Sequence, residues 1–126
     1  MNKWMFLPVR SIVQAKNLWV RLATVLISPG AVGLHVLDSF ASGVPLFTTT
    51  NARHGPEIDY LEHDRNGFIV NDDPERQAQA ILDLLADPVR LAAVVEAGRQ
   101  AASRLTVANM TANFVSGMVQ CLDGWF

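Results

Sequence analysis

The sequence predicts an α/β fold in which a parallel sheet carries helices on both of its faces. Short apolar runs alternate along the chain with stretches whose apolar residues recur every three or four positions, a pattern typical of strands that alternate with crossover helices. A turn with two glycines at residues 29–33 also follows one apolar run and leads directly into a helical stretch. This order of strand, glycine turn and helix indicates parallel strands joined by right-handed crossovers.

Size and composition indicate one globular domain. The chain has 126 residues, of which 50% are hydrophobic and 17% are charged, which excludes an intrinsically disordered protein. No apolar run reaches the roughly 20 residues that span a bilayer, and no secretory signal is recognised near Met1. The single cysteine, Cys121, excludes an internal disulfide framework and favours a reducing cytoplasm.

The charges are divided unevenly along the chain, whose net charge is −2. The first 37 residues contain no acidic residue and four basic ones, which are Lys3, Arg10, Lys16 and Arg21. Such an end can contact phosphates or the anionic inner surface of a membrane, although an ordinary solvated face explains four scattered charges as well. No dense Lys/Arg cluster with interleaved aromatic residues occurs, so nucleic acid binding is not expected.

Five elements are predicted before residue 50: a strand over 4–9, a helix over 11–22, a strand over 25–27, a helix over 34–42 and a strand over 44–48. The strand over 25–27 is apolar throughout, so we expect it to be buried on both faces. Ser11 is suited to cap the first helix, and Gly43 ends the second.

Five further elements are predicted after residue 50: a short helix over 57–63, a strand over 68–70, and three helices that begin near Pro74, Pro88 and Thr106. Asp72 or Asp73, Asp87 and Thr106 are placed to cap the three helices. The helix after Pro74 is expected to bury Ala78, Ile81, Leu82 and Leu85. The last helix carries its apolar residues on one face, which are Val107, Met110, Phe114 and Met118.

The glycine turn is the strongest candidate for an anion site. The first N–H groups of a helix lack partners within it, so we expect the backbone of Gly30, Ala31, Val32, Gly33 and Leu34 to bind a phosphate. Each charge-assisted hydrogen bond is worth about 1.5–3 kcal/mol, and the helix dipole adds about 0.3–1 kcal/mol. Gly30 and Gly33 would allow positive φ angles and a close approach of the ligand.

Five segments, taken in order, resemble one enzyme family. They are residues 23–29, residues 30–45, Gly55-Pro56-Glu57-Ile58, residues 66–70 and the helix start at Asp73-Pro74. Over residues 22–122 the sequence thereby resembles the carboxy-terminal, donor-binding domain of GT-B glycosyltransferases, specifically the retaining family 4 (group 1) enzymes. The resemblance implies a Rossmann-like sheet in one partial domain over residues 1–126, without the first strands and without the acceptor-binding domain of that family.

The resemblance also implies a function. It is the recognition of a nucleotide-sugar donor, of UDP or GDP type, for a retaining hexosyltransferase of polysaccharide biosynthesis that acts on a glycan or lipid-linked acceptor. Transfer requires an acceptor-binding domain or partner chain, so the chain alone is expected to be inactive. No cofactor or metal ion is implied, and the expected location is the cytoplasm, with at most peripheral contact to the inner membrane surface. The alternative is a non-catalytic interaction module that associates through its exposed sheet edge.

Individual site residues follow from the family pattern Glu-x7-Glu, which falls on Gly30 and Asp38 of this chain. In the family the first glutamate contacts the donor sugar and the second contacts the nucleotide ribose. Asp38 is therefore the expected ribose ligand, whereas the sugar contact is absent at Gly30. Residues 29–34 are similar to the form Pro-Gly-x-Val-Gly-Leu that some members carry.

Other polar residues near the turn are weaker candidates. Glu57 and Arg53 are candidate ligand contacts, although Glu57 also complements the dipole of its own helix. Asp38 has the corresponding alternative of a solvated helix residue. No compact set of metal ligands occurs, so the histidines are interpreted as surface or capping residues, which are His35, His54 and His63.

Overall fold

The computed structural model describes residue 16 and residues 18–124. Its elements follow the chain in the order β1 (Leu26–Ser28), α2 (His35–Ser42), β2 (Leu46–Thr49), the 3-10 helix η2 (Pro56–Tyr60), β3 (Phe68–Val70), α3 (Pro74–Leu85), α4 (Pro88–Arg104) and α5 (Val107–Asp123). Residues 18–22 are also helical. The predicted strand over 4–9 and the first part of the predicted helix over 11–22 lie outside the described residues.

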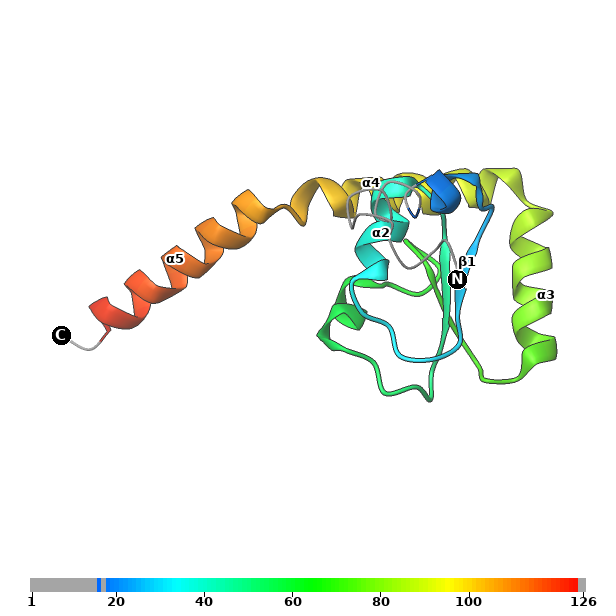
Figure 1. Cartoon of the computed structure of the whole chain (residues 1–126), viewed down its shortest axis with the longest axis horizontal. Helices are drawn as coiled ribbons and strands as arrows, with labels where there is room; N and C mark the ends of the chain where they lie inside the picture. Colours follow the sequence, from blue (N-terminus) through cyan, green and yellow to red (C-terminus); the bar gives the residue numbers. More distant parts are fainter. Residues whose placement is uncertain (1–15, 17, 125–126) are drawn as a thin grey trace, which may run out of the picture.

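Three parallel strands form the sheet, in the order β1-β2-β3 (Figure 1). Leu26 of β1 pairs with Leu46 of β2, and Phe47 of β2 pairs with Phe68 of β3. The strand over 68–70 has the predicted bounds, and the helix predicted over 34–42 is α2, one residue shorter. The predicted α/β class with a Rossmann-like parallel sheet is confirmed.

Helices cover both faces of the sheet, as predicted. Neighbouring residues of β2 point to opposite faces, so Leu46 packs with Phe40 of α2, whereas Phe47 packs with Leu84 of α3. On this second face the rings of Phe47 and Phe68 stack with their centroids 4.4 Å apart. The sheet therefore lies between two apolar layers, and each layer is anchored by a phenylalanine.

Helix α4 crosses one end of the sheet and connects the two layers. Figure 1 shows it running along the top of the molecule from α3 towards α5. It contributes Val94 to the layer with α3 and Ala101 to the layer with α2. Gly98 permits this close crossing, because a Cβ atom there would lie 3.2 Å from Cδ1 of Phe40 and 3.9 Å from the carbonyl oxygen of Asn66.

The predicted amino-terminal caps of the last three helices are confirmed. Asp73 and Asp87 each accept a hydrogen bond from an N–H of the first helical turn at 3.0 Å, and Thr106 accepts one at 3.1 Å. Pro74 and Pro88 follow their caps in the first turn, where a missing N–H costs nothing.

Two strands differ from their predicted bounds. β2 begins at Leu46, two residues late, because Val44 still donates its N–H to the carbonyl oxygen of Ser39 and Pro45 has no N–H to offer. β1 covers residues 26–28 and is one of the two edge strands of the described sheet. The expectation that this strand is buried on both faces is therefore wrong, and Ile27 is 55% exposed.

Two helices also differ from prediction. In place of the short helix predicted over 57–63, the chain forms the 3-10 helix η2 over residues 56–60. This helix ends because Leu61 is extended and buries its side chain in the layer with α2. In α3 the buried residue is Leu84, supported by Ala80 and Ile81. Of the four residues predicted to be buried in α3, three are exposed: Ala78, Leu82 and Leu85. The face of α3 that packs on the sheet is therefore rotated about the helix axis relative to the predicted one.

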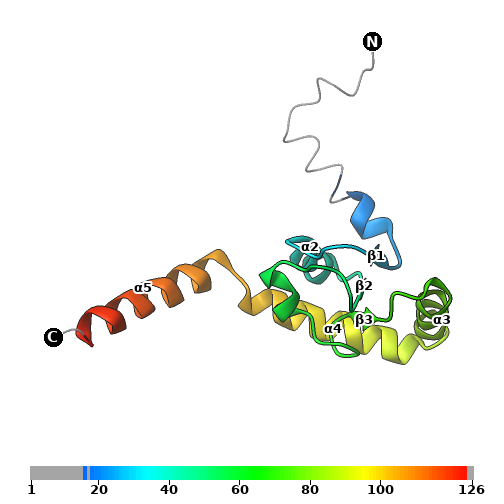
Figure 2. The same ribbon diagram turned by 90° about the horizontal axis from the view of Figure 1, so that it is seen from below.

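Helix α5 extends away from the sheet, as Figures 1 and 2 both show. None of its residues is buried, and the predicted apolar face is exposed along its length. Among the helices of the described residues, none has the length and apolar character required to cross a membrane.

Gly43 is expected to be required at the end of α2. It has a φ of 70°, and a Cβ there would lie 3.1 Å from Nη2 of Arg99 and 3.3 Å from Cγ1 of Val95. We expect Gly43→Ala to lower the free energy of unfolding by about 1–2 kcal/mol in urea denaturation. The matched control is Gly30→Ala, where a Cβ meets no atom within 4 Å and the expected change is below about 0.5 kcal/mol. Equal effects of the two substitutions would contradict this account.

Candidate functional site

The candidate site lies at the carboxyl ends of β1 and β2, where the chain turns into α2. Residues 29–34 form the turn between β1 and α2 (Figure 1). Nε2 of His35, the first residue of α2, lies 3.1 Å from Oγ of Ser28 at the end of β1. Oγ1 of Thr49, at the end of β2, donates to the carbonyl oxygen of Pro29 at 2.9 Å. The turn is therefore held against the ends of both strands.

The loop after β2 holds the turn through Val32. The N–H of Val32 donates to Nδ1 of His54 at 3.2 Å, and the carbonyl oxygen of Val32 accepts from the N–H of Gly55 at 2.9 Å. Nε2 of His54 lies 2.7 Å from the carbonyl oxygen of Thr49. The side chain of Val32 is buried in the layer with α2. We call the hydrogen bonds of Val32 with His54 and Gly55 the Val32 latch.

The two partners of His54 determine its tautomer. The N–H of Val32 can only donate, so Nδ1 is the nitrogen without a proton. The carbonyl oxygen of Thr49 can only accept, so Nε2 carries the proton. The ring is therefore neutral in this arrangement, and it joins two backbone groups that are 17 residues apart in the sequence.

Several N–H groups at the start of α2 remain available to a ligand. Among the described residues, the N–H groups of Ala31, Gly33, Leu34 and His35 have no protein acceptor. The N–H of Val32 donates to Nδ1 of His54 and is therefore not available to a phosphate. The prediction that Val32 donates a hydrogen bond to a phosphate is wrong. The predicted positive φ angles of Gly30 and Gly33 are also absent, because Gly43 is the only described glycine with a positive φ.

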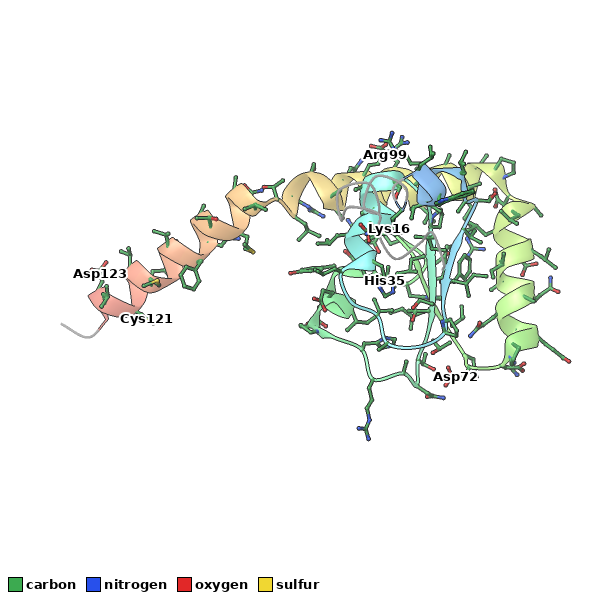
Figure 3. All side chains as sticks on the ribbon, in the orientation of Figure 1. Lys16, His35, Asp72, Arg99, Cys121 and Asp123 are labelled. Atoms are coloured by element: carbon green, nitrogen blue, oxygen red, sulfur yellow. The ribbon has the colours of Figure 1, made fainter. Side chains whose placement is uncertain are left out.

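Asp38 lies one turn into α2 and pairs with Lys16. Oδ2 of Asp38 and Nζ of Lys16 are 2.8 Å apart, and Figure 3 shows Lys16 beside α2. The Asp38 side chain is 35% exposed and that of Lys16 is 53% exposed, so the pair is worth about 0–1 kcal/mol. The lysine therefore orients the carboxylate without burying it, and hydroxyl groups of a ligand can compete for it.

Glu57 and Arg53 lie on the segment that carries the latch. A Cβ atom on Gly55 would lie 2.5 Å from Oε2 of Glu57 and 3.2 Å from the carbonyl oxygen of Val32. Glu57 therefore folds back over Gly55, and a side chain at position 55 would displace the Glu57 carboxylate and crowd the carbonyl oxygen of Val32. Arg53 is exposed and has no acidic partner among the described residues. Arg53 directly precedes His54 of the latch in the sequence.

One buried hydroxyl at this end of the sheet has no partner. Oγ1 of Thr48 makes no hydrogen bond within the described residues, although the side chain is buried. Thr48 lies on the same face of β2 as Leu46, which is the face that packs against α2. A buried hydroxyl without a partner lowers the stability of the fold by about 1–3 kcal/mol. A polar atom that hydrogen-bonded to Oγ1 of Thr48 would recover part of this free energy.

The three histidines contact separate partners. His35 lies against Ser28, His54 belongs to the latch, and Nδ1 of His63 accepts from the N–H of Ile69 at 3.1 Å. Within the part of the chain that the structure describes, no three His, Cys, Asp or Glu side chains gather as metal ligands would.

Three polar residues of the site were not predicted from the sequence: Ser28, Thr49 and His54. The first two are signalled only by their position, because polar side chains at the carboxyl ends of parallel strands face the loops of the site. His54 had no signal of its own, since its two partners become neighbours only when the strands pair.

The Val32 latch is expected to stabilise the turn measurably. In His54→Ala the buried N–H of Val32 loses its acceptor, so we expect a loss of about 1–3 kcal/mol in unfolding free energy and faster amide hydrogen exchange at Val32. His54→Gln keeps a donor and an acceptor and is expected to lose less. Arg53→Ala, on the neighbouring exposed residue, is the control, and an equal effect there would show that the latch contributes nothing.

Comparison with known proteins identifies the family of the chain. The sequence model of the family described as Glycosyl transferases group 1 matches residues 6–87 of the 126-residue chain. The matched range contains β1 to α3, with the turn at 29–34 and the Val32 latch. No curated protein matches the chain closely enough to count as a relative. Because the family match covers more than half of the chain, the protein belongs to the group 1 glycosyl transferases.

Proposed function

We propose that this chain binds the nucleotide diphosphate part of a nucleotide-sugar donor for a retaining glycosyl transfer. The observation that carries the proposal is the set of N–H groups of Gly33, Leu34 and His35, which have no acceptor within the described residues and stand at the start of α2. A helix start concentrates a partial positive charge of about +0.5. A phosphate placed there would accept hydrogen bonds that the fold itself leaves unused.

Preorganisation supports the proposal. The Val32 latch and the Thr49–Pro29 contact hold the turn to two strands, so the N–H groups need little rearrangement to meet a ligand. A binding site that is already ordered avoids the conformational entropy cost of ordering on binding. The site is therefore suited to hold a leaving diphosphate in place while the sugar is transferred.

Asp38 is the proposed ribose ligand. Its carboxylate lies one turn after the phosphate-binding N–H groups, and a carboxylate can accept hydrogen bonds from two hydroxyl groups at once. The carboxylate pairs with Lys16 at 2.8 Å and stays 35% exposed, so a ligand can reach it. A ribose would then exchange a weak surface ion pair for hydrogen bonds to a charged group, which are worth about 1.5–3 kcal/mol each.

The sugar end of the donor is proposed to face the loop with Arg53 and Glu57. Gly30 has no carboxylate for the sugar, and a Cβ there would meet no atom within 4 Å. Glu57 is an acidic side chain that folds over Gly55 of the latch. We propose that it takes part in sugar recognition and that Arg53 contacts the diphosphate.

Transfer itself is proposed to require an acceptor held opposite this edge by another domain or chain. Every candidate donor contact in this chain lies on one side, at the carboxyl ends of the strands. Sugar transfer needs both substrates in near-attack geometry. No step of this proposal uses a metal ion. The cytoplasm is the proposed location, since the one cysteine is exposed and free.

A titration of the labelled protein with UDP, GDP and ADP tests the proposal. Binding is expected to shift the amide NMR signals of Gly33, Leu34 and His35 with one of the three nucleotides more than with the others. Inorganic pyrophosphate should shift the same signals more weakly, because it lacks the ribose. A well-dispersed spectrum that none of the nucleotides alters would favour a non-catalytic interaction module instead.

The role of Asp38 is tested by a pair of substitutions. Asp38→Ala is expected to weaken nucleotide binding about 10-fold, because a lost charge-assisted hydrogen bond of about 1.5–3 kcal/mol corresponds to at least that factor. Lys16→Ala removes the competing ion pair and leaves the carboxylate, so calorimetry should show unchanged or tighter binding. Weakening by Lys16→Ala alone would assign the contact to the lysine and overturn the role of Asp38.

A further inference from the structure

The Val32 latch contains one side chain that changes its charge near neutral pH, the imidazole of His54. Its Nδ1 accepts the N–H of Val32 at 3.2 Å, and its Nε2 lies 2.7 Å from the carbonyl oxygen of Thr49. An imidazole ordinarily gains a proton between about pH 8 and about pH 5. In the protonated ring both nitrogens are donors, so Nδ1 can no longer accept the N–H of Val32.

Rotation of the ring does not restore the latch. A protonated ring can keep its hydrogen bond to the carbonyl oxygen of Thr49, but the N–H of Val32 then faces a second donor. Turning the ring over exchanges the two nitrogens and leaves the same pair of donors in contact. Val32 is 1% exposed, so water does not replace the lost acceptor while the turn stays in place. Protonation therefore favours a turn that has moved away from the loop after β2.

The charged groups closest to the ring in the sequence have opposite signs. The turn over 29–34 and residues 46–52 have no titratable side chain. Arg53, which precedes His54, is exposed, and the carboxylate of Glu57 folds over Gly55 of the latch. Their effects on the protonation of the ring are opposite in sign. The hydrogen-bond partners of Nδ1 and Nε2 therefore decide which form of the ring the latch holds.

The other titratable groups on the elements around the latch face different parts of the fold. In α2, His35 lies against the end of β1, and Asp38 belongs to a surface ion pair. After β3, Asp73 caps α3. In η2, Asp59 and Tyr60 line a recess at the end of α4. Among the described residues of these elements, His54 is thus the titratable side chain that the closed latch uses.

We propose that His54 is a pH switch of the donor site, in which the neutral ring closes the Val32 latch and the protonated ring opens it and weakens the hold on a diphosphate. The first part of this proposal concerns the latch alone, whereas the second part rests on the proposed function. Val32 directly precedes the N–H groups of Gly33 and Leu34, which have no acceptor within the described residues. Once Val32 is released, a ligand has to order the turn when it binds, and this entropy cost lowers its affinity.

The closed latch binds one proton fewer than the open latch, because closure uses the lone pair of Nδ1. A rise in pH shifts an equilibrium towards the form that binds fewer protons. The closed latch is therefore favoured above the titration range of the ring, and it is lost as the pH falls through that range. Diphosphate affinity follows the same direction.

Hydrogen exchange of the labelled full chain without nucleotide tests the first part. The protection factor of the Val32 amide, which corrects for the pH dependence of exchange in an unstructured chain, is compared at about pH 7.5 and about pH 5.5, on either side of the ordinary titration midpoint of histidine. Acidification is expected to lower it at least about 10-fold, since loss of the acceptor of a buried N–H is worth about this factor.

Two substitutions assign the response. His54→Gln keeps a donor and an acceptor but does not titrate, so its Val32 protection is expected to change less than about threefold. His63→Gln removes a histidine that accepts the N–H of Ile69 outside the site and is expected to keep the wild-type response. A constant protection factor in the wild type overturns the proposal. An equal fall in His54→Gln, or loss of the response in His63→Gln, assigns the effect to other groups and also overturns it.

Calorimetry with UDP and with GDP at the same two pH values tests the second part. Acidification is expected to raise the dissociation constant of the wild type at least about fivefold more than that of His54→Gln. Titration of the diphosphate itself affects both proteins alike. If the Val32 amide responds to pH but both proteins lose affinity equally, the latch does not control binding and the second part is wrong. If neither nucleotide binds at either pH, the proposed function and the second part are both wrong, whereas the exchange experiment decides the first part independently.

Discussion

The contacts that fix Val32 against the sheet are the constraint on which the rest of the site depends. Its side chain packs in the layer with Val36 and Leu46, while its N–H and carbonyl oxygen are bonded to His54 and Gly55. The residue is thus fixed from three directions, and α2 begins three residues later, at His35. Because a helix has little freedom beyond its first turn, fixing Val32 also fixes the direction of the N–H groups that follow it. The ring of His54 connects the backbone N–H of Val32 to the backbone carbonyl oxygen of Thr49.

The fold could be predicted where the signals are local. Side-chain caps and first-turn prolines act within three residues, so the starts of α3, α4 and α5 were correctly predicted. The exposure of Ile27 and the buried face of α3 were not correctly predicted. The first depends on the order of the strands in the sheet, and the second depends on where Phe68 lies relative to α3. The 3-10 form of η2 likewise results from the burial of Leu61, a tertiary contact that overrides the helical pattern after Pro56.

The site could be predicted in outline, because strand, glycine turn and helix are consecutive in the sequence. Its details depend on contacts between distant residues: His54 reaches Val32 across 22 positions, and Lys16 reaches Asp38 across 22. Neither contact leaves a mark in the local sequence. The glycines were expected to supply positive φ angles, yet their backbone conformation is one that other residues adopt. Absence of a side chain therefore matters more at Gly55, where Glu57 and Val32 approach closely.

The site at the carboxyl ends of the strands offers little positive charge for a diphosphate. A nucleoside diphosphate carries more than one negative charge, whereas the start of α2 offers a partial charge of about +0.5. The segment that carries the latch has one positive residue, Arg53, and one negative residue, Glu57, and the chain as a whole has a net charge of −2. Long-range attraction of a diphosphate to this site is therefore weak, and the proposed binding would depend on short-range hydrogen bonds to the turn. On the proposed function, further positive charge for a leaving diphosphate would come from outside this site. The proposed acceptor-binding surface is one source, because it would approach the same phosphates during transfer.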